Sequence, residues 1–199
     1  MSDDSNGDIE TASNTFDFDG VKNDINRRAI AIGFLLVFLS GFVDWYEFEG
    51  KLSDGDVTET FMEGDLTGED ARDSYDHAKN LWFLSIIGLG AILLNKDVLN
   101  QHIGNKNYGN LFLGAGVICL LLAYSVYSEI NEDMDDIEDS LDAMASLYSA
   151  EGAEFDESYS VSADFDSKYK IGFYMALLGP LGVLYGGYNI NLLNQIQRD

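Results

Sequence analysis

Apolar and polar residues are separated into long blocks along this chain. Four blocks are nearly free of charged residues, at 29–43, 81–94, 111–127 and 171–190, and acidic residues fill the segments between them. A soluble protein instead interleaves apolar and polar residues at the period of a helix or strand, so that each element has one buried face. Separation on this scale is typical of a chain that crosses a lipid bilayer.

Each block predicts one membrane-spanning helix. A span needs about 20 mostly apolar residues, with a range of about 17–25, and the third and fourth blocks reach this range directly. The first block reaches it when the flanking Trp45 and Tyr46 are counted. The second block is the weakest, with 14 apolar residues in a row, so a three-span chain is the alternative. Lys79 and Lys96 flank this block and can extend to the lipid headgroups.

The pattern predicts an all-α fold, a four-helix transmembrane bundle whose third transmembrane helix extends into a small acidic helical ectodomain. We expect an acidic disordered inner tail at residues 1–24 and a four-span membrane domain at 25–199. The expected spans are about 27–46, 79–98, 108–128 and 170–190, and the outer loops are 47–78 and 129–169.

Basic residues indicate the orientation of the chain. With the N-terminus inside, the inner segments hold six basic residues in 53 positions and the outer segments five in 80. Arg27 and Arg28 lie directly before the first span, where basic residues have the strongest effect on orientation. We therefore expect a multi-pass protein of the cell membrane with both termini in the cytoplasm.

The longer outer loop contains an apolar seam whose members are spaced 4, 3, 4, 3 and 4 residues apart. These are Ile130, Met134, Ile137, Leu141, Met144 and Tyr148. Such spacing gives a helix one apolar face, with acidic residues on the others. Residues 117–151 contain no Gly or Pro, so the third span is predicted to continue as one helix until Gly152 ends it.

Two partners are possible for this seam. A second helix is predicted at 69–79, and packing of its apolar face against the seam would form a helical ectodomain. The alternative is a coiled coil with another subunit. An irregular acidic segment, 154–167, is expected to lead from the seam helix to the fourth span.

The fourth span carries a face of small residues, Gly172, Ala176, Gly179, Gly182 and Gly186. Small residues allow helix backbones to approach closely in lipid, and Gly182–Gly186 is a GxxxG motif. We expect this face to pack inside the bundle. The alternatives are a dimerisation face and a hinge at Pro180, the only proline of the chain.

The chain is strongly acidic, with 35 Asp and Glu against 11 Lys and Arg and a formal net charge of -24. Such charge repels itself at low salt, but at molar salt the screening length falls to about 3 Å. The acidic residues are spread over every polar segment, which resembles the composition of proteins from extreme halophiles. The same charge argues against nucleic-acid binding, which needs a basic surface.

Signs of catalytic or metal chemistry are sparse. His77 and His102 are expected on opposite sides of the membrane, and the chain has no HExxH or CxxC motif. The acidic run at 133–142 lacks the spacing and central glycine of an EF-hand loop. We therefore expect no catalytic, cofactor-binding or metal-binding residues, no cofactor and no enzymatic activity.

These observations favour a non-enzymatic structural or accessory subunit in the membrane of a halophile, acting through helix–helix and ectodomain contacts. Its expected partners are the lipid bilayer and either a second copy or another membrane protein. The alternative is a small oligomeric transporter or channel, whose pore would be lined by Ser40, Ser85, Tyr124 and Ser125.

Overall fold

The structure is a computed structural model that describes residues 16–55, 57–104, 107–154 and 159–196. These residues form seven helices and three strands: α1 Phe18–Asn23, α2 Ile25–Ser40, β1 Asp44–Ser53, β2 Thr58–Thr67, α3 Gly68–Ser74, α4 Asp76–Leu93, α5 Lys96–Ile103, α6 Tyr108–Ala153, β3 Ser162–Tyr169 and α7 Ile171–Ile196. Of the expected tail, residues 1–15 lie outside the described residues, and 18–23 form α1.

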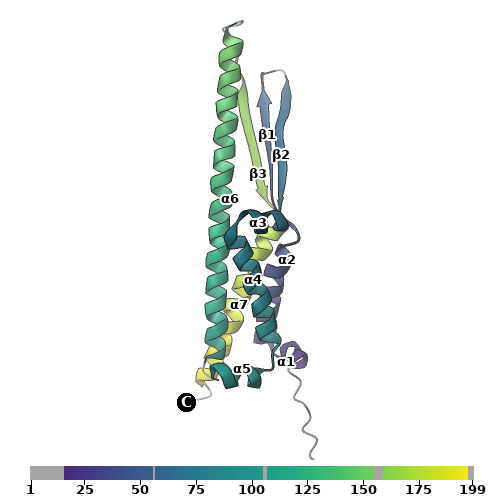
Figure 1. Cartoon of the computed structure of the whole chain (residues 1–199), viewed down its shortest axis with the longest axis vertical. Coiled ribbons are helices and arrows are strands. Elements are labelled where there is room, and N and C mark those ends of the chain that lie inside the picture. The colour runs from purple at the N-terminus through teal and green to yellow at the C-terminus, as the bar shows by residue number, and fades with distance from the viewer. Residues whose placement is uncertain (1–15, 56, 105–106, 155–158, 197–199) are drawn as a thin grey trace, which may run out of the picture.

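The molecule is elongated and has two halves that share α6 (Figure 1). In the helical half, α2 packs against α4 and α7, and the first part of α6 packs against the same two helices. In the sheet half, the three strands lie beside the second part of α6. The short helices α1 and α5 and the C-terminal end of α7 lie at the end of the molecule farthest from the sheet.

The predicted all-α fold, with a four-helix transmembrane bundle and a helical ectodomain, is wrong. The chain contains a three-stranded antiparallel sheet in the order β2-β1-β3. Within the described residues, two helices and not four are long and apolar enough to cross a membrane, α6 and α7.

The helices at the other two expected spans, 27–46 and 79–98, do not reach that length and hydropathy. Helix α2 ends at Ser40 after 16 residues, and the chain then enters β1. Helix α4 has 18 residues, but its beginning contains Asp76 and Lys79, which lower its mean hydropathy.

The sheet forms because polar and apolar side chains alternate along its strands. In β1, Tyr46 and Phe48 belong to the apolar core or pack against it, whereas Glu47 and Glu49 point to the other face. Strand β3 pairs with β1 over its whole length, with Phe165 opposite Gly50. This period of two is the pattern of a sheet with one buried and one solvated face. The segment expected to be irregular, 154–167, therefore contains most of β3.

A tight turn joins β1 to β2. The Asp54 backbone amide donates to the Val57 carbonyl oxygen at 3.1 Å, and the Val57 amide donates to Asp54 Oδ1 at 3.0 Å. Gly55 has a φ of 96°, a conformation that glycine adopts without steric cost. An Asp-Gly pair between two alternating segments is a strong hairpin signal.

Side-chain caps begin two of the helices that lead into the core. Asp24 accepts hydrogen bonds from the amides of Asn26 and Arg27 at the start of α2. Thr67 and Asp70 form a reciprocal capping box at the start of α3. The helix predicted at 69–79 is therefore present, as α3 and the first residues of α4.

Candidate functional site

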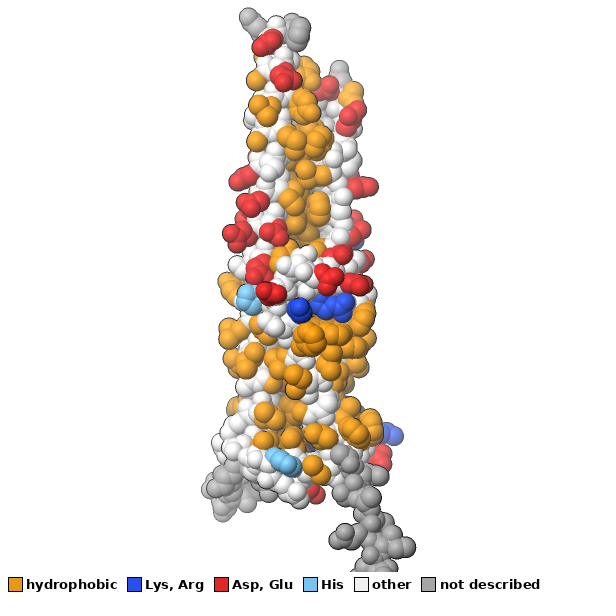
Figure 2. All heavy atoms as spheres, in the orientation of Figure 1, with side chains coloured by type: hydrophobic (Ala, Val, Ile, Leu, Met, Phe, Trp, Pro, Cys, Tyr) orange, Lys and Arg blue, Asp and Glu red, His pale blue; other side chains and the backbone are white. Residues whose placement is uncertain are grey.

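The outward surface of the helical half is largely apolar. Each of its four helices exposes large apolar side chains, for example Leu35, Phe83, Leu121 and Leu178. Figure 2 shows hydrophobic side chains over much of this half, and over the sheet half it shows acidic side chains on both sides of a narrower hydrophobic stripe. A soluble monomer rarely exposes a continuous apolar patch larger than a few hundred Å². This surface, on the half that contains the apolar parts of α6 and α7, is the candidate membrane-contact surface.

Basic and aromatic side chains meet where the helical half joins the sheet half. The Arg72 guanidinium carbon lies 4.7 Å from the ring centroid of Trp82 and 5.7 Å from that of Phe42. Trp45 Nε1 donates a 2.6 Å hydrogen bond to the Ser40 carbonyl oxygen, at the end of α2. Arginine and tryptophan both combine an apolar body with a polar tip, so they suit the level of lipid headgroups. Figure 2 shows Lys and Arg side chains at this level, between the acidic and apolar regions.

Two tyrosine hydroxyls fix α6 at the same level. Tyr169 donates to Asn131 Oδ1 at 2.5 Å, and Tyr75 donates to Asp133 Oδ2 at 2.6 Å. Burial raises the pKa of both hydroxyls, and the Asp133 carboxylate raises the pKa of Tyr75 further. Both groups therefore stay protonated and keep donating. They connect α6 to the end of β3 and to the junction between α3 and α4.

At the opposite end of the helical half, the N-terminal segment is held against the end of α4. The Asp17 amide donates to the Leu93 carbonyl oxygen at 2.9 Å. Its carboxylate accepts hydrogen bonds from the Arg27 side chain and from the Gly20 amide. These two bonds, the Arg27 bond foremost, hold the pKa of Asp17 below its ordinary value. The carboxylate is therefore ionised at neutral pH and balances the charge of the buried Arg27.

The predicted helix-packing residues of α7 lie close to α2 and to the start of β1. A Cβ atom on Gly179 would lie 2.5 Å from the Gly33 carbonyl oxygen, and one on Gly172 would lie 2.6 Å from Trp45 Cδ1. Gly182 and Gly186 face α2 in the same way, and Ala176 is buried. The small-residue face thus contacts neighbouring elements of its own chain.

The six seam residues lie along α6, which is continuous from Tyr108 to Ala153. The buried ones are Ile130, Met134 and Leu141, and the partly buried ones are Ile137 and Met144. Tyr148 is exposed. A Cβ atom on Gly50 of β1 would lie 3.1 Å from Leu141 Cδ2. The seam therefore packs against the sheet of the same chain, whereas a helix was expected as its partner.

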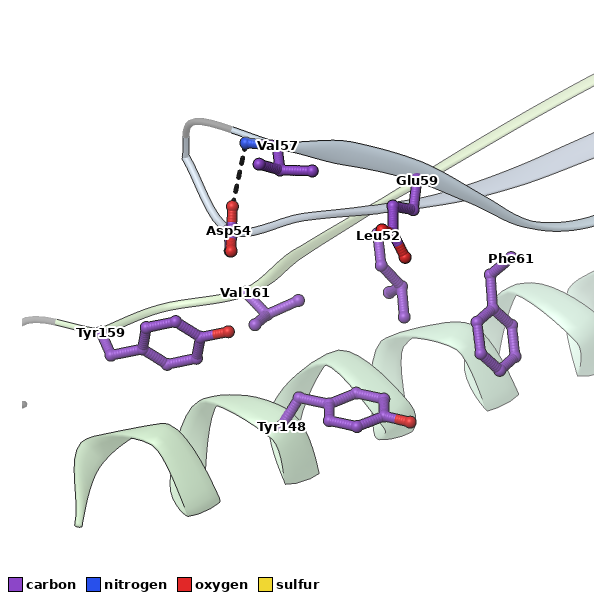
Figure 3. Close-up of a pocket in the computed structure, with 8 residues that line it drawn as sticks. All are labelled: Leu52, Asp54, Val57, Glu59, Phe61, Tyr148, Tyr159 and Val161. Atoms are coloured by element: carbon purple, nitrogen blue, oxygen red, sulfur yellow. Dashed lines mark hydrogen bonds between the residues drawn. The ribbon is translucent and has the colours of Figure 1, made fainter. Parts of the chain in front are cut away.

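At the end of the sheet half farthest from the helical half, the sheet and α6 enclose an open groove of about 480 Å³. The residues that line it come from both sides of the hairpin turn, from α6 and from the chain before β3 (Figure 3): Leu52, Asp54, Val57, Glu59, Phe61, Tyr148, Tyr159 and Val161. Three aromatic rings and two carboxylates thus border one groove.

Sequence reasoning found only one of these groove residues, Tyr148, as a member of the seam. The others fall in segments that were interpreted as loops. The Asp54-Gly55 pair, with apolar and polar residues alternating on either side of it, indicates this part of the fold. Together these features predict a β-hairpin with one apolar face, and such a face is normally covered by another element.

The residues of the transporter hypothesis lie in different surroundings. Ser40 and Ser85 are buried, and each hydroxyl donates a hydrogen bond within its own helix. Ser40 donates to the Val37 carbonyl oxygen at 2.7 Å, and Ser85 donates to the Trp82 carbonyl oxygen at 2.6 Å. Ser125 bonds within α6, and Tyr124 is exposed on the outside of the same helix. In one copy of the chain, the three serine hydroxyls are thus used for hydrogen bonds within their own helices.

Metal-ligating side chains do not gather in the described part of the chain, where no group of three or more His, Cys, Asp and Glu is placed to hold an ion. His77 lies near the sheet and contacts Glu129, with 2.7 Å between Nδ1 and Oε1. His102 lies in α5, at the other end of the molecule.

No protein-family model matches the chain, and none of the curated proteins matches it either.

Proposed function

We propose that this chain is a non-enzymatic accessory subunit of a membrane, held in the bilayer by α6 and α7, that presents its sheet half to a partner. The observation that supports this most strongly is the continuity of α6. Its apolar first part belongs to the helical half, and its second part forms one side of the sheet half without a break. A helix of 46 residues is about 70 Å long, roughly twice the thickness of a bilayer core. The sheet half therefore projects rigidly from the membrane surface.

The proposed orientation places both termini in the cytoplasm and the sheet half outside. The end that carries α1, α5 and the end of α7 is the end where Arg27 and Arg28 precede the apolar part of α2. Basic residues beside the first apolar segment favour the cytoplasmic side. The chain would then be a multi-pass protein, since α6 and α7 run in opposite directions through the bilayer.

The acidic surface supports a halophilic source. On the outer face of the sheet, Glu49 of β1 lies directly opposite Asp166 of β3, whereas Glu47 lies opposite Lys168 and Asp164 lies opposite Lys51. Like charges opposite each other on paired strands destabilise a sheet. At molar salt that repulsion is largely screened, so the sheet is best suited to a salt-rich medium.

Crosslinking in native membranes tests the accessory role. A photoreactive amino acid would replace Phe61 on the sheet half, and the matched control would carry it at Leu121 on the helical half. We expect the Phe61 position to give one defined adduct with another protein or a second copy. A chain that stays uncrosslinked at Phe61 while remaining in the membrane fraction would contradict the accessory role.

A further inference from the structure

Helix α6 does not cover the whole apolar face of the sheet. It contacts β3 and β1, while residues of β2 and its turn remain open, with Phe61 48% and Val57 53% exposed. The uncovered part is the groove that Tyr148 of α6 borders on the other side (Figure 3). A three-stranded sheet is wider than one helix, so a single helix leaves one edge of its face open.

An irregularity in the strand pairing turns a carboxylate into this groove. Gly50 pairs with Met62, but the next residue, Lys51, pairs with Thr60, so Phe61 is an extra residue in β2. Glu59 consequently pairs with Leu52, a residue of the apolar face. Bulges of this kind redirect side chains. Without the extra residue, Glu59 would lie on the outer face with the other acidic side chains of the sheet.

The chemistry of the groove suits a cation attached to an apolar segment. Its lining contains the carboxylates of Asp54 and Glu59 and the rings of Phe61, Tyr148 and Tyr159, and none of its eight lining residues is basic. Aromatic faces attract Lys and Arg side chains within about 6 Å, and carboxylates pair with them. The apolar side chains of Leu52 and Val161 provide contact area for neighbouring residues of the same segment.

A second copy of this chain fits the groove poorly. Two grooves facing each other would bring Glu59 and Asp54 of one copy against the same carboxylates of the other, and this like-charge contact is unfavourable. The net charge of -24 adds to the repulsion. Charge complementarity therefore favours a different protein that brings a basic segment.

We propose that this groove binds a partner protein through an exposed segment in which Lys or Arg alternates with apolar residues. The basic side chain lies between the rings of Tyr148 and Tyr159 with its charge toward Glu59. This proposal rests on the proposed function, because the groove belongs to the half of the molecule that projects from the membrane.

Peptide binding to the purified full-length protein in lipid nanodiscs tests the proposal. The probe is a short fluorescent peptide of alternating Lys and Val, and the matched peptides carry Gln or Glu in place of Lys. Fluorescence anisotropy gives each Kd. We expect the Lys peptide to bind at least about tenfold more tightly than the Gln peptide, and the Glu peptide not to bind.

Variants identify the site. We expect the double variant Glu59→Gln/Tyr148→Ala to weaken binding of the Lys peptide about tenfold. The matched controls are Glu63→Gln, on the outer face of the same strand, and Leu147→Ala, the neighbour of Tyr148 on α6. Both are exposed and should leave the Kd unchanged. Equal binding of the Lys and Gln peptides would overturn the proposal, because it means that the positive charge is not recognised. Equal loss in the control variants would also overturn it, because that result means unspecific attraction to an acidic surface.

The two proposals fail in different ways. If the peptide test fails while the Phe61 crosslink to another protein persists in membranes, the accessory role stands, but the partner meets the groove without a segment of alternating basic and apolar residues. If the natural chain instead self-associates in analytical ultracentrifugation and Tyr148→Ala weakens that self-association, the occupant is a second copy and the proposed basic partner is wrong.

Discussion

The guanidinium of Arg27 and the carboxylate of Asp17 form an ion pair in which Nη1 and Oδ2 lie 2.5 Å apart. Nη2 of the same guanidinium donates to the carbonyl oxygens of Ile92 at 2.9 Å and Leu94 at 3.2 Å. These carbonyls belong to the end of α4, where a helix has no partners of its own for its last carbonyls. One buried side chain thus connects the N-terminal segment, α2 and α4.

Replacing Arg27 should destabilise the fold strongly. Arg27→Ala leaves Asp17 without its counterion and leaves the carbonyls at the end of α4 without a donor. We expect the free energy of unfolding to fall by about 2–3 kcal/mol through the lost charge-assisted hydrogen bonds. The unpaired Asp17 adds less than a fully buried charge would, because its side chain is partly exposed. Arg28→Ala is the matched control, because Arg28 is exposed and should change little. Thermal unfolding in detergent, followed by circular dichroism, measures both; equal loss in the two variants would contradict this role.

The same ion pair predicts a specific response to acid. The pKa of Asp17 is lower in the folded chain than its ordinary value. Its contribution to stability is therefore complete above about pH 4 and is lost as the pH falls through the folded pKa. We expect the difference in unfolding midpoint between the natural chain and Asp17→Asn to stay constant down to about pH 4 and then to shrink. A difference that grows in acid would contradict the lowered pKa of Asp17 in the folded chain.

The close contact between α2 and α7 predicts that added volume is not tolerated there. A Cβ atom on Gly33 would lie 2.5 Å from the Gly179 carbonyl oxygen. Gly33→Ala should therefore force the two backbones apart and reduce stability by about 1–3 kcal/mol. Gly90→Ala in α4 is the control, because no atom lies within 4 Å of its added Cβ, and alanine favours a helix over glycine. Unfolding midpoints that rank Gly33→Ala equal to Gly90→Ala would contradict the close packing.

The packing of the seam on the sheet predicts different costs at two leucines of α6. Leu141 is fully buried, whereas Leu147 is 65% exposed. Leu141→Ala should reduce stability by about 2–5 kcal/mol through the lost contacts and the cavity, and Leu147→Ala by no more than about 0.5 kcal/mol. Limited proteolysis of the sheet half reports the effect directly. If both variants are cleaved at the rate of the natural chain, the seam does not hold the sheet half together.

Periodicity predicted the helices better than the strands. The lack of Gly and Pro from 117 to 151 predicted the uninterrupted course of α6. Five of the six seam residues are buried or partly buried, whereas Tyr148 is exposed. The sheet was missed because charged residues, acids and one lysine in each strand, alternate with apolar or small residues along most of β1 and β3, and the acidic segments were interpreted as solvated loops. In Tyr46-Glu47-Phe48-Glu49 the same acids are one half of a strand alternation.

The end of the first apolar block shows why hydropathy alone misplaces helix ends. Trp45 and Tyr46 were counted as the end of a span, yet both belong to β1. Helix α2 stops at Ser40, whose carbonyl oxygen accepts a hydrogen bond from the Trp45 side chain. The Gly68 amide donates to the Val43 carbonyl oxygen at 2.8 Å. The contact between Gly68 and Val43 joins residues far apart in the chain, and a local pattern does not reveal it.

The arrangement of the groove likewise could not be predicted from the sequence. It depends on the extra residue at Phe61, which turns Glu59 toward Leu52. Nothing in the order of residues 58–62 marks where a strand gains one residue relative to its neighbour. The position of Tyr148 opposite this bulge depends in turn on how α6 crosses the sheet.

Cysteine accessibility tests most directly whether the helical half lies in the bilayer with the sheet half outside. Starting from Cys119→Ala, which removes the only cysteine, single cysteines would replace Thr60 on the sheet, Leu121 on the helical half and Asp97 in α5, all of them exposed. A membrane-impermeant maleimide would then be added to intact cells and to lysed membranes. We expect labelling at position 60 in intact cells, at position 97 only after lysis, and at position 121 only in detergent. Labelling at position 121 without detergent would contradict the membrane placement, and labelling at position 97 in intact cells would reverse the orientation.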